Sequence, residues 1–428
     1  MRVLAAAGPG LSAYREGGGY QGLEQVGARG GGWLRDEMAL SGLRGRGGAA
    51  FPVATKWEAA WSQPGPRAVV VNGAEDEPGS LKDRYLLATR PHLVLEGALC
   101  SARALEASLV VCYVNEEAAG PLRVMAAAAA EAGAAGLAGD VEVTVVAAPA
   151  AYVAGEDSCA LEFIERGGEQ PQPRAKPPYP AEHGLHGWPT AVSNVETLAH
   201  VALIARHGAE WFKDVGTRGY PGTLLVTLPG GCARPGVYEV AAGTPLASVL
   251  SDCGGGPAGA PFRGAQVGGP AAGWLTAAGF DVPLDPEALS VRGSMLGCAA
   301  VRLLPEDRCA VDAVAEVEGF FAAESCGKCP LCRAETQFFD RVLAGLRDGK
   351  GIKEAHLDKA LELASAAATG TDCALARFPA APLRTAREQF PEDFAAHLSG
   401  RDCGRTHLGS AMSISRWPPP WFGSDAGA

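Results

Sequence analysis

The sequence predicts an α/β protein in three folded parts: a doubly wound α/β layer, a small α+β module and a C-terminal helical bundle. Up to about residue 220, short apolar strands alternate with helical patterns, which is typical of a parallel sheet with crossover helices. A shorter set of strands follows, and from residue 311 onward only helical patterns remain. We therefore expect domains at 1–220, 221–275 and 311–400, a connector at 276–310 and a disordered tail at 401–428.

The first part contains three predicted strands. They are expected at 68–72, 108–114 and 141–147, with helices at 93–105, 118–132 and 195–205. Residues 1–41 are rich in glycine and alanine and show little periodicity beyond one helix near 33–41. A proline-rich connector spans 171–180.

The second and third parts differ in their patterns. In the module, strands are expected at 223–228, 237–240 and 265–267, with a short helix at 245–251. In the last part, helices at 311–323, 334–346, 353–368 and 384–398 have lengths that suit a four-helix bundle.

Composition excludes several functional classes. The net charge of −11 argues against general nucleic-acid binding. No apolar run approaches the ~20 residues that cross a bilayer. The apolar start, Met1–Ala7, ends at Gly8-Pro9-Gly10 and is too short for a signal peptide. We expect a cytoplasmic protein that reaches the inner membrane, if at all, through a larger complex.

Four cysteines near the C-terminus predict a metal centre. Cys326, Cys329 and Cys332 form a C-x2-C-x2-C run, and Cys373 follows after 40 intervening residues. Three closely spaced thiolates plus one from elsewhere are the ligand set of a cubane iron–sulfur cluster. Zinc sites usually use two separated C-x2-C pairs, and disulfide frameworks belong to short secreted chains. The sequence thus favours a cluster that transfers electrons, and most of the other eight cysteines are interpreted as small buried hydrophobes.

Two kinds of loop are candidates for ligand binding. Residues 42–52 form a glycine loop with two arginines. It is either an anion-binding loop or simply a flexible one. It does not follow a strand as the G-x-G-x-x-G motif of a Rossmann fingerprint does. Glu75, Asp76 and Glu77 follow the first strand, and Glu156 and Asp157 follow the third. If both loops lie at the carboxyl edge of one sheet they converge on a ligand; otherwise they are solvated acidic turns.

Taken together, these segments resemble the NADH-binding flavoprotein (F) subunit of respiratory complex I, or NADH–quinone oxidoreductase, and its relatives in NAD-linked hydrogenases and formate dehydrogenases. The resemblance runs from about Gly18 to Leu398, in the segments 41–52, 72–84, 151–157, 176–190, 193–198, 293–297, 324–333 and 371–375. It implies a Rossmann-like FMN/NADH domain, a small β-grasp module of the soluble-ligand-binding type and a four-helix bundle that carries a [4Fe–4S] cluster.

The resemblance also assigns residues. FMN would be held by Gly45, Arg46, Gly47, Lys56, Asn72, Asn194 and Thr197. Glu75, Glu77 and Glu156 would lie near the flavin or the nucleotide, and Phe51 and Tyr179 would stack on adenine. The cluster would use Cys326, Cys329, Cys332 and Cys373. Departures from the family pattern, at Ala74, Asp76, Asp157 and Ser193, alter the predicted nucleotide pocket.

The implied activity is that of an NADH dehydrogenase. A hydride would pass from NADH to FMN, and single electrons would pass through the cluster to a small iron–sulfur partner, either a thioredoxin-like [2Fe–2S] subunit or a ferredoxin. No catalytic acid or base is expected. Two alternatives remain open: NAD+ reduction driven by a ferredoxin, hydrogenase or formate dehydrogenase partner, and a cluster-binding assembly subunit that has lost nucleotide binding. Lys328 and Arg333, beside the cluster ligands, either meet an acidic partner or stabilise cluster charge.

Overall fold

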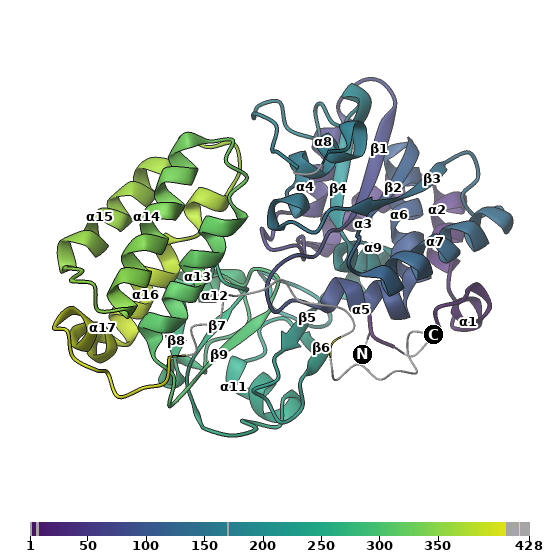
Figure 1. The fold of residues 1–428 in the computed structure, drawn as a ribbon. Coiled ribbons are helices and arrows are strands. Elements are labelled where there is room, and N and C mark those ends of the chain that lie inside the picture. Colours follow the sequence, from purple (N-terminus) through teal and green to yellow (C-terminus); the bar gives the residue numbers. More distant parts are fainter. Residues whose placement is uncertain (1, 6–7, 169–170, 408–418, 420–428) are drawn as a thin grey trace.

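The computed structural model describes residues 2–5, 8–168, 171–407 and 419 (Figure 1). The α/β domain and the helical bundle lie at opposite sides of the molecule, and the strands of the small module lie between and below them. Residues 408–418 and 420–428, which belong to the predicted disordered tail, lie outside the described residues.

The first domain is built on a four-stranded parallel sheet. Its strands are β1 (Arg67–Gly73), β2 (Ala107–Asn115), β3 (Glu142–Ala148) and β4 (Thr190–Asn194), in the order β3-β2-β1-β4. Val69 and Val71 face one side of the sheet and Val70 faces the other, as the two-residue period of a strand requires. The first side is covered by α2 (Gln21–Arg29), α3 (Gly31–Ser41), α4 (Val53–Trp61), α6 (Pro91–Leu105), α7 (Ala119–Ala134) and α9 (Val195–His207), and the second by α8 (Asp157–Arg166).

The strand order reverses beside β1. The chain moves outward from β1 to β2 and β3, and then β4 returns to the opposite side of β1. The last paired residues of the two strands are Asn72 and Asn194, which lie opposite each other. In open α/β sheets, ligands bind outside the carboxyl ends of the strands at such a switch point. The predicted parallel sheet is confirmed, and its topology selects the β1/β4 edge as the place to look for a ligand site.

The N-terminal segment is more helical than predicted. In place of one helix near 33–41, the chain forms α1 (Leu11–Glu16), α2 and α3. Leu23 and Val26 of α2 and Leu34 and Met38 of α3 are buried in the main core. These pairs have helical spacing, but the glycines around them obscure the pattern.

The small module contains two sheets. β5 (Thr223–Leu228) pairs with β6 (Gly236–Ala241), and β7 (Phe262–Val267) lies between β8 (Trp274–Thr276) and β9 (Val301–Pro305). A short helix, α11 (Leu246–Ser248), continues as a π-turn over Val249–Cys253. β9 and α12 (Pro286–Val291) lie in the segment predicted as a connector, so that segment contributes a strand to the sheet of the module.

The helical region contains five helices within its described residues. They are α13 (Ala310–Glu324), α14 (Pro330–Arg347), α15 (Glu354–Ala367), α16 (Ala380–Gln389) and α17 (Pro391–Leu398). The single helix predicted over 384–398 is wrong, because Pro391 disfavours a helical residue before it and Phe390 adopts φ −131° and ψ 52°. Among the described residues, no helix combines the length and the apolar character needed to cross a membrane.

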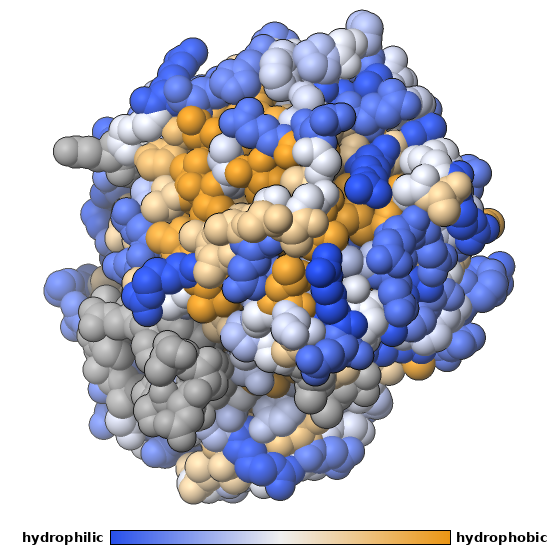
Figure 2. All heavy atoms as spheres, turned by 90° about the vertical axis from the view of Figure 1, so that its right-hand side faces the viewer, coloured by the Kyte–Doolittle hydropathy of each residue, from blue (hydrophilic) through white to orange (hydrophobic). Residues whose placement is uncertain are grey.

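One face of the α/β domain is rich in apolar side chains. Figure 2 shows them as a broad orange and pale orange band among hydrophilic residues. The outer strand of the sheet, β3, also has half-buried valines at Val143, Val145 and Val146. Apolar surface and an uncovered strand edge are features typical of proteins that contact other chains.

Candidate functional site

Loops from four parts of the α/β domain meet at the carboxyl ends of β1 and β4. The Asn72 side-chain amide donates to the Gly155 carbonyl at 2.8 Å, which joins the end of β1 to the loop after β3. The Asn194 side-chain oxygen accepts from the Glu196 amide at 3.0 Å and caps α9. Two amide side chains in register thus fix the loops that surround the switch point.

The glycine loop 42–52 closes over this edge. Its base is a hydrogen bond from the Gly45 amide to the Phe51 carbonyl, 2.8 Å. The Arg46 amide donates to the Thr197 hydroxyl at 2.8 Å. A Cβ atom at Gly47 would lie 3.1 Å from the Cβ of Asn194, so a side chain there would crowd the edge. The loop therefore brings bare backbone to the N-terminus of α9, an arrangement that suits an anionic group.

The Arg46 side chain has a different use from the one predicted. It is 3% exposed, and its guanidinium donates to the carbonyls of Pro221 at 2.7 Å and Thr223 at 3.2 Å. The same group lies 4.0 Å from the centre of the Tyr220 ring. The guanidinium therefore fastens the glycine loop to the start of β5, and the backbone of Arg46 is the part that faces Thr197.

A buried charge network lies beneath the loop and was missed by the sequence analysis. The Lys82 ammonium lies 2.8 Å from Asp83, 3.1 Å from Glu196 and 3.2 Å from the Asn194 side-chain oxygen. Burial alone would lower the pKa of Lys82, but the two carboxylates outweigh it and raise the pKa. Burial would raise the pKa of Glu196, whereas Lys82 brings it below its ordinary value. Lys82 lies in segment 72–84 and Glu196 in segment 193–198, and the resemblance of these segments to the family was the feature of the sequence that could have pointed to both residues.

The acidic residues after β1 face into the fold. Glu75 accepts from the amides of Asp83 at 3.1 Å and Arg84 at 2.9 Å, at the start of α5 (Lys82–Thr89), where the helix dipole favours an anion. Asp76 pairs with Arg84 at 3.3 Å, and burial raises the pKa of Asp76 to about 7. Glu77 accepts from the Tyr152 hydroxyl at 3.1 Å, and burial raises the pKa of Glu77 to about 8. The carboxylates of Glu75 and Asp76 are thus engaged inside the domain.

The remaining predicted residues are spread along β4: Tyr179 adjoins Pro180, whose carbonyl accepts from the Thr190 amide at the amino end of that strand. Lys56 contacts the Asp157 carboxylate at 3.0 Å and the Val192 carbonyl at 2.8 Å. Glu156 caps α8 through the amides of Ser158 and Cys159 and also pairs with Lys176. Phe51 and Tyr179 are 48% and 56% exposed, so both rings are accessible to a ligand from solvent.

The four predicted cluster cysteines belong to one small apolar cluster. Of the four, Cys332 is buried within this apolar cluster, and Cys326, Cys329 and Cys373 are partly buried and pack against the cluster. The Asp372 amide donates to the Cys329 sulfur at 3.5 Å, and the Ser325 hydroxyl lies 3.6 Å from the Cys332 sulfur. Burial raises the pKa of Cys332 and of Cys373 to about 11. Four thiols, one of which accepts a backbone hydrogen bond and another of which lies beside a hydroxyl, suit an iron–sulfur cluster, whose sulfurs accept such bonds.

A short segment connects the two candidate sites. It runs through Tyr152–Gly155, a 3₁₀ turn, into the start of α8. Val153 and Cys159 pack in the same apolar cluster as the four cysteines, while the Gly155 carbonyl binds Asn72 at the end of β1. Tyr152 also packs edge-on against Phe320 of α13, with ring centres 5.1 Å apart. One segment of about eight residues therefore contacts both sites.

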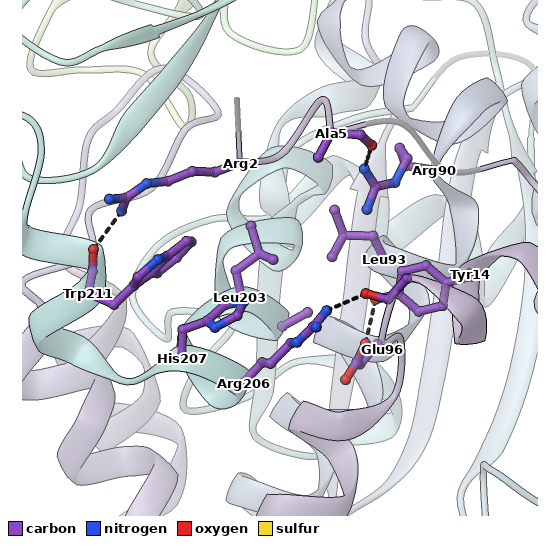
Figure 3. A pocket seen from close by; sticks show the side chains of 12 residues that line it. Arg2, Ala5, Tyr14, Arg90, Leu93, Glu96, Leu203, Arg206, His207 and Trp211 are labelled. Carbon is purple, nitrogen blue, oxygen red and sulfur yellow. Dashed lines mark hydrogen bonds between the residues drawn. The ribbon is translucent and has the colours of Figure 1, made fainter.

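A separate cavity of about 210 Å³ lies between the N-terminus, α6 and α9 (Figure 3). Arg2 donates to the Trp211 carbonyl at 2.6 Å, Arg90 donates to the Ala5 carbonyl, and Tyr14 donates to Glu96. These polar groups are already paired, and they fasten the N-terminal segment to the domain. The cavity contains none of the predicted cofactor residues.

Comparisons with known proteins identify the three parts of the chain. Three family models match: the Nuo51 FMN-binding domain over 38–203, the SLBB domain over 225–273 and the NADH-ubiquinone oxidoreductase-F iron-sulfur binding region over 312–397. The F subunit of NADH-quinone oxidoreductase from Mycobacterium tuberculosis is 38% identical over 376 residues, 85% of this chain and 84% of the relative. The corresponding F subunit of Streptomyces coelicolor is 38% identical over 402 residues, 92% of this chain and 89% of the relative.

A solved structure of NAD+-reducing [NiFe]-hydrogenase in the H2-reduced state superposes with a TM-score of 0.81 and 31% identity. The match covers 89% of this chain and 65% of the hydrogenase chain, so this chain spans about two thirds of that protein's length. The predicted fold is confirmed by these matches in all three parts. The chain belongs to the family of NADH-quinone oxidoreductase F subunits, oxidoreductases with an FMN-binding domain and a [4Fe–4S] domain.

Proposed function

We propose that this chain takes electrons from NADH at an FMN held at the β1/β4 edge and delivers them singly to a cluster on Cys326, Cys329, Cys332 and Cys373. The observation that carries the proposal is the Tyr152–Cys159 segment, which contacts both sites. Electron transfer between two centres requires that they lie near one another, and only a few residues of this segment separate its contact with Asn72 from its contacts with the cysteine cluster.

The residues at the edge fit a flavin phosphate. The backbone of the glycine loop reaches the N-terminus of α9 at Gly47 without an intervening side chain, and the amides of Gly45 and Arg46, bonded to Phe51 and Thr197, hold the loop in that position. Asn72, Asn194, Thr197 and Lys56 would bind the polar atoms of the flavin from the strand ends and from α4. Lys82 supports this wall from below by holding Asn194 and Glu196.

When bound there, FMN would supply hydride acceptance from NADH and the release of two electrons one at a time. The chain's own residues orient the ligands and exclude water. Glu77 retains its proton near neutral pH because burial raises its pKa to about 8, so this part of the wall carries less negative charge than its sequence suggests.

The nucleotide would approach from the exposed side of the edge. Phe51, on the glycine loop, and Tyr179, in the proline-rich connector, both present accessible aromatic rings. Stacking of a base on such a ring contributes on the order of 1–3 kcal/mol. We propose that these rings hold adenine and leave the nicotinamide to reach the flavin, with Glu156 nearby.

Electrons would leave to a small iron–sulfur protein, a thioredoxin-like [2Fe–2S] subunit or a ferredoxin, within the cytoplasm. The relatives are named as subunits of larger assemblies, which supports a partner. Lys328 is engaged with Asp372 at 3.0 Å and with the Pro173 carbonyl. Arg333 is exposed and lies over Gly327, and Leu331, two residues earlier on α14, is 51% exposed. We therefore assign Leu331 and Arg333, rather than Lys328, to the docking surface.

The test is cofactor analysis followed by reduction with NADH under anaerobic conditions. Wild-type protein should contain about one FMN, four iron atoms and four acid-labile sulfides per chain. NADH should bleach the flavin absorbance and then produce the electron paramagnetic resonance signal of a reduced cluster. Cys329→Ala should retain FMN and its bleaching but lose this signal, while Cys253→Ser, a half-buried thiol of the small module, should behave as the wild type.

The outcomes separate the alternatives. Wild-type protein with iron but no flavin would favour the assembly subunit, and zinc in place of iron would refute the cluster. The reverse direction has support from a relative named NADP-reducing hydrogenase subunit HndC, of Solidesulfovibrio fructosivorans, 32% identical over 394 residues. NAD+ reduction by a chemically reduced cluster, faster than cluster reduction by NADH, would favour that direction.

A further inference from the structure

A second group of metal-binding side chains lies at the far end of the bundle from the four cluster cysteines. It consists of Cys309, His397, Cys403 and His407, whose ligand atoms all lie within 4.8 Å of one another. The Cys309 sulfur lies 3.3 Å from His397 Nε2, and the Cys403 sulfur lies 3.4 Å from His407 Nε2. The group is separate from the iron–sulfur site, because Cys309 precedes α13 and Cys326 follows it, and the 15 residues of α13 span about 22 Å.

Backbone contacts bring these side chains together. After α17 the chain returns to the start of α13 (Figure 1), where the Cys309 amide donates to the Thr406 carbonyl at 3.1 Å and the Thr406 amide donates to the Asp307 carbonyl at 2.7 Å. Asp393 of α17 accepts from the Ala310 amide at 2.7 Å and from Arg405 at 3.1 Å. Three separate segments thus converge on one point.

The donor set has the chemistry of a zinc site. Two thiolates and two imidazoles in a tetrahedral arrangement favour Zn²⁺. Zn–S and Zn–N bonds at a tetrahedral angle place neighbouring S and N atoms about 3.6 Å apart, close to the observed separations. His397 Nδ1 lies 3.2 Å from the Leu346 carbonyl, so a proton on Nδ1 leaves Nε2 free to bind a metal.

We propose that Cys309, His397, Cys403 and His407 bind one structural Zn²⁺. Four protein ligands complete a tetrahedral shell, so the site is closed and not catalytic. Its role is to fasten residues 401–407 to the ends of α13 and α17. Cys309 is fully buried and His397 is 8% exposed, while Cys403 is half-buried and His407 is exposed. The metal would therefore join two buried ligands on the bundle, Cys309 and His397, to two more exposed ligands on residues 401–407, Cys403 and His407.

The test is metal analysis of untagged, full-length protein with its iron–sulfur cluster intact. Wild-type protein grown with added zinc should retain about one zinc per chain after gel filtration with a chelator. X-ray absorption at the zinc edge should give two sulfur and two nitrogen neighbours. Cys403→Ser and His407→Ala, both on the returning segment, should lose the zinc while iron stays at about four per chain. Cys253→Ser and His356→Ala, away from the group, should keep it.

Three results would overturn the proposal. One is wild-type protein with less than about 0.1 zinc per chain after zinc-supplemented growth. Another is full zinc retention in both Cys403→Ser and His407→Ala. The third is a Cys309–Cys403 disulfide in protein purified under reducing conditions, seen by mass spectrometry of the unreduced peptides. Because the iron content is measured in the same samples, failure here is distinguishable from failure of the proposed electron-transfer function.

Discussion

Substitution of Lys82 by methionine should destabilise the α/β domain strongly. Lys82 is 1% exposed, and so is its partner Glu196 at 3.1 Å, while Asp83 at 2.8 Å is 6% exposed. Methionine fills a similar volume but leaves two buried carboxylates without their cation. Breaking a buried ion pair by removing one partner costs about 3–5 kcal/mol. We expect a loss of that size, together with weaker FMN retention, because Asn194 also contacts Lys82.

The pH dependence follows from the same network. The pKa of Lys82 is raised, so its contribution is present below the unfolded-state pKa and is lost only as pH rises through the folded-state value. The pKa of Glu196 is lowered, so its contribution is present above its unfolded-state pKa and is lost as pH falls through the folded-state value. Burial raises the pKa of Asp83 to about 7 even beside Lys82, so Asp83 is fully charged only above that value. The gap between wild type and Lys82→Met should therefore grow as pH rises through neutrality.

The assay is thermal unfolding followed by circular dichroism, with flavin content measured on the same preparations. The matched control is Lys213→Met, because Lys213 also pairs with a glutamate, Glu210, at 2.7 Å, but the two side chains are 37% and 85% exposed. An exposed pair of this kind contributes up to about 1 kcal/mol. If Lys82→Met lowers the melting temperature no more than Lys213→Met, the buried network does not stabilise the domain as argued.

Three further predictions concern the walls of the candidate site. Tyr179→Ala should weaken NADH binding by about 5- to 150-fold with little change in FMN content. Titration with NADH measures this, with Tyr238→Ala as the control. Loss of flavin with unchanged NADH affinity would contradict the stacking role of Tyr179. Glu77→Gln should remove the loss of stability that wild-type protein shows as pH rises from about 4.5 to about 8, because burial raises the folded-state pKa of Glu77 and glutamine stays neutral; parallel curves of melting temperature against pH would refute it. Arg46→Lys should lower stability by about 1.5–3 kcal/mol, because lysine cannot reproduce both carbonyl contacts, and unchanged unfolding would show that they contribute little.

The elements that could be predicted from sequence are those with long apolar runs. β1, β2 and β3 are rich in valine and flanked by polar turns, and α6 and α7 have helical spacing over many residues. The sequence pattern does not predict β4, because this strand is only five residues long and ends in two polar side chains, Ser193 and Asn194. The topology that places Asn72 beside Asn194 depends on that short strand.

Side-chain use was harder to predict than residue location. The glycine loop lies against Thr197 and Asn194, as expected. The guanidinium of Arg46, however, binds backbone carbonyls at the start of β5, and the carboxylate of Glu75 accepts from amides at the start of α5. A loop sequence shows which charges are present, whereas their partners come from segments far away along the chain. For the same reason the sequence does not predict the group around Cys309, because Cys403 and His407 lie about a hundred residues away along the chain.

The contact between the α/β domain and the bundle bears directly on electron transfer. The Tyr152 amide donates to the Glu324 carboxylate at 3.0 Å, and its ring packs against Phe320, Phe321 and Phe378. Because Tyr152 also donates to Glu77 behind the β1/β4 edge, one residue links the wall of the proposed flavin site to the helix that precedes the first cluster cysteine. Aromatic packing of this kind, partly buried and hydrogen-bonded at both ends, resists rotation of one domain against the other. Tyr152 therefore restrains the wall of the proposed flavin site relative to the helix that leads into the first cluster cysteine.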